Sequence, residues 1–196
     1  MANSKKQSER KKLEWKFTEN GNSTGKVRVY ISSTINTQSR VTNQRVAKVL
    51  QDSGFYQVCL PQDSIPAIHH AELERWAPRY CERYIDWADI ILLLMDTYGI
   101  DCSWEVGCAH KFKPIVGYVE NSVNFETHRQ DWMVKYSISC VITTSPEISR
   151  LSKKDKMFKE IPVYRVKDAR ELPRRMLSFY RWKASQAGQE MMVLRF

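Results

Sequence analysis

The longest apolar run in the chain is Ile90–Met95, within the segment DIILLLM. It is far too short to cross a bilayer, which needs about 18–20 apolar residues. It also lacks the alternation of a strand that has one face in water, and so it is typical of a parallel strand covered by helices on both sides. Such a strand needs further strands beside it and helices above and below. The run therefore predicts an α/β fold.

Other segments supply the partners that this strand requires. Strand-like stretches lie at 26–32, 55–61, 114–119, 139–144 and 161–166, and helix-like stretches lie at 43–54, 71–88 with an interruption near Pro78, 103–112, and 168–185 with Asp168 as N-cap. Strands that alternate with helices imply right-handed crossovers and a parallel sheet. We predict a single flavodoxin-like, doubly wound α/β domain with a parallel five-stranded sheet over residues 26–196. Residues 1–25 are expected to form a flexible basic N-terminal arm.

Composition narrows the class of protein. A length of 196 residues fits one domain, and a net charge of +9 favours anionic partners, from nucleotides to nucleic acid. No zinc-finger, RNA-recognition, helix-turn-helix, GxGxxG or Walker A signature accompanies the charge. The five cysteines form no CxxC pair, and the first residues lack the apolar core of a secretory signal. We expect a cytoplasmic protein with reduced thiols, no metal, no organic cofactor and no membrane partner.

Ligands of doubly wound folds bind beyond the carboxyl ends of the strands. Three loops are predicted to meet there, at residues 32–41, 61–70 and 96–104. Glu105 follows the third loop and is predicted to lie in the first turn of a helix, with Cys102 or Ser103 as N-cap. The helix dipole would keep its carboxylate ionised, as a nucleophile requires. The alternative is an acid that only stabilises its helix.

Polar residues after the first strand are candidates for binding a substrate. The hydroxyls of Ser32, Ser33 and Thr34 could hold a phosphate with help from Arg40, although a polar loop that caps a helix explains them equally well. Trp104, next to Glu105, could stack on a base, although buried packing is the commoner role of tryptophan.

Three motifs together resemble a known family. They are KVRVYISST at 26–34, GFYQVCLPQD at 54–63, and YIDWADIILLLMD followed by DCSWEVGCAHKFKPIVGYV within 84–119. The last contains the most specific elements, Asp89, EVGCA from Glu105 and the Lys113-Pro114 pair. Together they resemble the nucleoside 2-deoxyribosyltransferase-like superfamily, which includes nucleoside 5′-monophosphate N-glycosidases.

The resemblance implies roles for individual residues. Glu105 would attack the anomeric carbon and form a glycosyl-enzyme, and Tyr30 would position its carboxylate. Asp101, or Asp96 as second choice, would handle the proton of the base. The loop after the second strand would bind substrate, which adds Gln62 and Asp63 to the candidates. No cofactor is implied, and homo-oligomers are expected because neighbouring subunits often complete such sites.

Other interpretations stay open. Some family members carry an acid near the position of Cys81, and the asparagine that some transferases lend across a subunit interface has no clear match here. The sequence is therefore compatible with both a transferase and a hydrolase. CSWE also faintly resembles the glutamate region of TIR-like domains, which hydrolyse NAD or signal by assembly. The basic charge alone would fit a non-catalytic nucleotide or nucleic-acid binding module.

Overall fold

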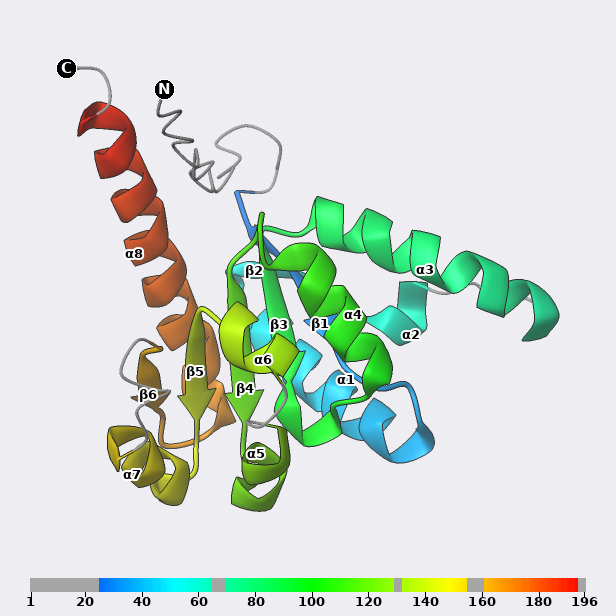
Figure 1. Cartoon of the computed structure of the whole chain (residues 1–196), viewed down its shortest axis with the longest axis horizontal. Coiled ribbons are helices and arrows are strands. Elements are labelled where there is room, and N and C mark those ends of the chain that lie inside the picture. The colour runs from blue at the N-terminus through cyan, green and yellow to red at the C-terminus, as the bar shows by residue number, and fades with distance from the viewer. Residues whose placement is uncertain (1–24, 65–69, 129–131, 155–160, 194–196) are drawn as a thin grey trace, which may run out of the picture.

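A parallel sheet of six strands forms the centre of the computed structural model, which describes residues 25–64, 70–128, 132–154 and 161–193 (Figure 1). The strand order is β2-β1-β3-β4-β5-β6. The strands are β1 (Val27–Ser32), β2 (Tyr56–Cys59), β3 (Ile90–Leu94), β4 (Ile115–Val119), β5 (Cys140–Thr143) and β6 (Val163–Arg165). The doubly wound, flavodoxin-like class is confirmed. The predicted number of five strands is wrong, because Val163 pairs in register with Val141 and adds a sixth.

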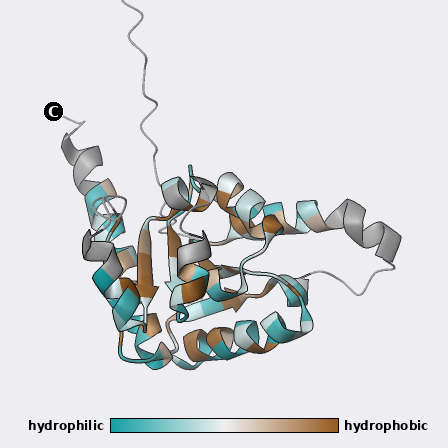
Figure 2. Ribbon diagram, turned by 60° about the horizontal axis from the view of Figure 1, so that its bottom comes forward, coloured by the Kyte–Doolittle hydropathy of each residue, from teal (hydrophilic) through white to brown (hydrophobic). Residues whose placement is uncertain are grey.

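Helices cover both faces of this sheet. They are α1 (Thr37–Asp52), α2 (Pro61–Ser64), α3 (His70–Trp87), α4 (Ile100–Ala109), α5 (Ser122–His128), α6 (Trp132–Ser137), α7 (Pro146–Lys154) and α8 (Leu172–Val193), with short 3-10 turns at η1 (Met95–Thr97) and η3 (Ala169–Glu171). α1 and α8 pack on one face, while α3, α4 and α6 pack on the other. Figure 2 shows hydrophobic residues concentrated in the central strands and hydrophilic residues towards the outside.

The apolar run that predicted the fold occupies the middle of the sheet. Every residue of β3 is buried, as a strand between two helical layers requires. Its alternate residues belong to different cores: Leu92 packs with α1 and α8, and Leu93 packs with α3 and α4. At the amino ends of β1 and β3, Arg28 donates two side-chain hydrogen bonds to Asp89, at 3.1 and 2.8 Å.

Helix boundaries differ from the prediction in several places. α1 begins at Thr37 rather than 43, because the Asn36 side chain caps it by accepting from the Ser39 amide. α3 continues through Pro78 instead of being interrupted there, although proline removes one backbone donor from the helix. α4 begins at Ile100, with Gly99 as an extended N-cap whose carbonyl accepts from the Cys102 amide at 3.0 Å. Cys102 and Ser103 are therefore not the N-cap, and Glu105 lies in the second turn rather than the first.

The ends of the chain are only partly described. Most of the predicted N-terminal arm, residues 1–24, lies outside the described residues, so the proposed division of the chain stays a prediction. Asp168 was predicted to cap the C-terminal helix. It caps the preceding turn η3, where its carboxylate accepts from the Arg170 amide at 2.8 Å. None of the helices in the described ranges is both long and apolar enough to pass through a membrane.

Candidate active site at the carboxyl ends of β1 and β3

Glu105 is a buried carboxylate held by two hydroxyl groups. Only 4% of the residue is exposed. Tyr30 donates to Oε1 at 2.6 Å, and Ser32 donates to Oε2 at 2.5 Å. Tyr30 and Ser32 are two residues apart on β1, and strand alternation therefore turns both side chains towards α4. The structure thus brings together three residues that the sequence had proposed. It places Ser32 against the carboxylate rather than in a substrate loop.

α3 supplies two further neighbours of Tyr30. The Cys81 sulfur lies 3.6 Å from the Tyr30 hydroxyl oxygen, and the ring of Tyr84 stacks on that of Tyr30 with centroids 6.3 Å apart. Burial raises the pKa of Cys81 to about 12, so this group stays a neutral thiol. Sequence reasoning did not find the contact between Cys81 and Tyr30, because it depends on how α3 packs against β1.

The carboxylate of Glu105 lies in an unfavourable environment for its charge. Burial raises its pKa, and the hydrogen bonds from Ser32, Tyr30 and Cys81 act in the opposite direction. Among the described residues no ion pair joins Glu105 to a lysine or arginine. The helix dipole was expected to keep this carboxylate ionised. Two features oppose that expectation. Burial disfavours the charged form of Glu105. The dipole also acts most strongly in the first turn of a helix, and Glu105 lies in the second turn of α4.

The other two residues predicted on α4 are more exposed. Asp101 is one turn before Glu105 and is exposed, so the two carboxylates do not share the buried environment. Its charge adds to the forces that raise the pKa of Glu105. Trp104 is 41% exposed rather than packed in the core, which leaves its ring accessible.

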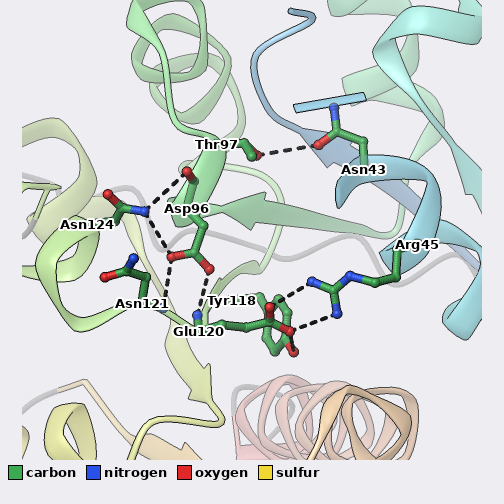
Figure 3. A network of polar contacts seen from close by, with 8 residues as sticks. All are labelled: Asn43, Arg45, Asp96, Thr97, Tyr118, Glu120, Asn121 and Asn124. Carbon is green, nitrogen blue, oxygen red and sulfur yellow. Dashed lines mark hydrogen bonds and ion pairs between the residues drawn. The ribbon is translucent and has the colours of Figure 1, made fainter. Parts of the chain in front are cut away.

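Asp96 belongs to a different network, shown in Figure 3. Its carboxylate accepts from the backbone amides of Glu120 at 2.6 Å and Asn121 at 3.0 Å, and from the Asn124 side chain at 3.3 Å. These bonds hold the loop between β4 and α5 to the end of β3. Asp96 is therefore engaged by this loop rather than by Glu105.

Two polar groups near the ends of β1 and β2 lack partners among the described residues. They are Ser33 Oγ and Gln62 Nε2. Ser33 is 6% exposed, and Gln62 is held in place by a hydrogen bond from Asn43 to its carbonyl oxygen at 3.2 Å. Buried polar groups are almost always hydrogen-bonded, so this pair marks positions where a water or a ligand would bind.

The remaining predicted residues lie on the surface or line a cleft. Arg40 and Asp63 are exposed on α1 and α2. Thr34 lines a cleft of ≈ 780 Å³ at the carboxyl edge of the sheet, as does Asp96. Glu105, Tyr30 and Ser32 are not among the residues that line this cleft.

The cleft is strongly polar. Its lining residues come from the segments after four strands and are Thr34, Asn36, Gln38, Ser39, Thr42, Asp96, Thr97, Tyr98, Glu120, Asn121, Ser122, Asn124 and Ser145. In the sequence analysis most of these residues were assigned to loops or helix caps and were given no binding role. Within the described ranges, no group of three or more histidine, cysteine or acidic side chains is arranged to hold a metal ion.

Comparisons with known proteins found a match to solved structures but none to family models or curated sequences. Among solved structures, the chain is similar to a 2-deoxyribosyltransferase from the psychrotolerant bacterium Bacillus psychrosaccharolyticus. The two are 19% identical, the match covers 70% of this chain and 99% of that one, and the TM-score is 0.48.

Proposed function

We propose that the chain cleaves or transfers at the N-glycosidic bond of a nucleoside or nucleoside 5′-monophosphate, with Glu105 as the nucleophile. One observation carries the proposal: a carboxylate that is 4% exposed is oriented by two hydroxyls at the carboxyl end of β1, without a cationic partner among the described residues. Burying an unpaired charge is costly, and such groups concentrate at functional sites.

The chemistry fits the groups that are present. A carboxylate oxygen of Glu105 would form a bond to the anomeric carbon as the bond from that carbon to the base nitrogen breaks. The bonding electrons leave with the base, which takes up a proton. Water or a second base would then displace the sugar from Glu105. Tyr30 and Ser32 act as positioning residues, because their hydrogen bonds fix both carboxylate oxygens.

The proton donor is better sought at Asp101 than at Asp96. Asp96 accepts hydrogen bonds from two backbone amides and one side-chain amide, which fix its position in the β4–α5 loop. Asp101 lies on the same helix as Glu105 and is exposed, so it can exchange protons with solvent. We therefore propose Asp101 as the group that protonates the leaving base.

Substrate would approach Glu105 from the side of α3. Cys81 is partly exposed to solvent and contacts the Tyr30 hydroxyl, which in turn contacts the Glu105 carboxylate. The unpartnered groups of Ser33 and Gln62 would bind the sugar or its substituents. The exposed ring of Trp104 offers a surface for stacking a base. Thr34, Arg40 and Asp63 remain proposed contacts, and homo-oligomeric assembly and a cytoplasmic location stay predictions.

A panel of nucleosides, nucleoside 5′-monophosphates and NAD tests this function. Chromatography should show a released base, and intact-mass measurement should show a sugar adduct on the wild-type chain. Glu105→Gln should give neither. Glu147→Gln, which makes the same change at an exposed site on α7, should give both.

Other outcomes would contradict the proposal. Base release that survives in Glu105→Gln would remove Glu105 from its role. Release from NAD alone would favour the NAD hydrolase interpretation. Salt-dependent binding of DNA or RNA without any turnover, unchanged in Glu105→Gln, would favour a non-catalytic binding module.

A further inference from the structure

The polar cleft at the carboxyl edge is separate from the set of residues around Glu105. It spans the point where the connections from β1 and β3 leave the sheet in opposite directions, which is where doubly wound folds bind ligands. We propose that this cleft binds an uncharged, sugar-bearing ligand, such as a nucleoside or a free sugar, and disfavours a phosphorylated one. This proposal concerns binding alone and does not depend on Glu105 being a nucleophile.

The first argument is that the N-termini of α1 and α7 at the cleft are already capped by side chains. The N-terminus of a helix normally attracts an anion because its amides are unpaired. At α1 the Asn36 side chain accepts from the Ser39 amide at 2.8 Å. At α7 the Ser145 hydroxyl accepts from the Ile148 amide at 3.4 Å. A phosphate would have to displace these side chains.

The backbone amides of the loop before α5 also already have hydrogen-bond acceptors. Its amides at Glu120 and Asn121 donate to the Asp96 carboxylate, and the Val123 amide donates to the Asn121 side chain at 2.8 Å. Asp96 thus takes the place that an anionic ligand would occupy. Figure 3 shows this carboxylate directed towards Glu120, Asn121 and Asn124.

The charges at the cleft also disfavour a phosphorylated ligand. No lysine or arginine is among its lining residues, and its charged groups are the carboxylates of Asp96 and Glu120. The neighbouring cation, Arg45, is held by Glu120 through two hydrogen bonds at 3.0 and 2.7 Å. Its charge is therefore compensated, and a phosphate would meet a carboxylate first.

The groups that remain suit a ligand with hydroxyls. Side chains such as Thr42, Ser122 and Gln38 can each donate and accept, and the Asp96 and Glu120 oxygens can accept from sugar hydroxyls. Tyr98 adds an aromatic ring to the lining, against which a base or a sugar ring can pack.

Binding measurements on the full chain test the proposal, with thymidine, D-ribose and thymidine 5′-monophosphate as probes. Calorimetry and saturation-transfer NMR should detect thymidine or ribose. They should show the monophosphate binding at least about tenfold more weakly than thymidine, because no lysine or arginine is among the described residues that line the cleft. Thymidine binding without ribose binding would identify the nucleoside as the ligand, and the converse would identify a free sugar. Binding of neither, or tighter binding of the monophosphate, would overturn the proposal.

Two pairs of variants locate the binding and test the role of charge. Glu120→Gln releases Arg45 and should raise affinity for the monophosphate about tenfold relative to thymidine. Asp52→Asn makes the same charge change by releasing Lys48 at the other end of α1, and should leave this ratio unchanged. Gln38→Trp should fill the cleft and abolish binding, whereas Gln44→Trp on the same helix should not. An unchanged ratio in Glu120→Gln, or undiminished binding in a folded Gln38→Trp protein, would refute the assignment.

Discussion

Replacing Tyr30 by phenylalanine tests how the charge of Glu105 is held. The substitution removes one hydroxyl and keeps the ring that stacks on Tyr84. Tyr30 is fully buried and Glu105 is 4% exposed, so water does not readily replace the lost donor. The hydrogen bond of 2.6 Å favours the charged carboxylate, and its removal should therefore raise the pKa of Glu105 further.

The size of the effect follows from the type of bond. A hydrogen bond to a charged group contributes about 1.5–3 kcal/mol. Because each tenfold change in an equilibrium constant corresponds to ~1.4 kcal/mol, the titration midpoint should move upwards by ~1–2 pH units. If Glu105 is the nucleophile, the acid limb of the rate profile should move by the same amount.

A direct titration reads this shift without assuming any activity. In protein labelled with ¹³C at glutamate side chains, the Glu105 carboxyl signal can be identified by its loss in Glu105→Gln and then followed against pH. Tyr84→Phe is the matched control, because it also removes one phenolic hydroxyl from the same stack. A midpoint in Tyr30→Phe that stays unchanged or falls would show that the hydroxyl does not stabilise the carboxylate, and would refute the reasoning.

Three further outcomes test the structure. Burial raises the pKa of Glu105 in the folded state, so the wild type acquires an unfavourable buried charge as pH rises above about 4.3, the ordinary glutamate pKa. Glu105→Gln should therefore become increasingly more stable than the wild type as pH rises. Thermal unfolding of both proteins from pH 4 to 8 measures this difference. Gly99→Ala should destabilise the fold by about 1–3 kcal/mol, because the added Cβ would overlap the Thr34 hydroxyl, and Thr34→Ala should restore much of the loss in denaturant titrations. Asp89→Ala should cost about 3–5 kcal/mol by the same assay, because it leaves Arg28, whose side chain is only 16% exposed, without its bidentate partner.

Much of the fold was predictable because it depends on local patterns. The unbroken apolar run of β3 indicated a strand between two layers, and the alternation in 26–32 indicated β1. The stretch 161–166 was recognised as strand-like although the predicted sheet had five strands, and its pairing with β5 makes it the sixth. Pro78 was read as a helix break because local rules disfavour proline within helices. In the structure the helix continues through Pro78, which is exposed on its surface.

The candidate site was less predictable. The pairing of Tyr30 with Glu105 came from the family resemblance, since nothing in their spacing of 75 residues indicates contact. Ser32 could have been found by noting that it shares a strand face with Tyr30. The engagement of Asp96 could not, because it depends on how the loop after β4 turns its amides towards β3. The contact of Cys81 likewise depends on the docking of a whole helix.

The strands at the two sides of the sheet have a consequence for how copies of this chain could associate. β2 has four residues and β6 has three, so each outer strand offers only a short row of unpaired backbone groups. Brief outer strands limit intermolecular strand pairing, a common route to fibrous aggregation. We therefore expect any assembly of this chain to form through surfaces other than β2 and β6, rather than by extending the sheet from one molecule to the next.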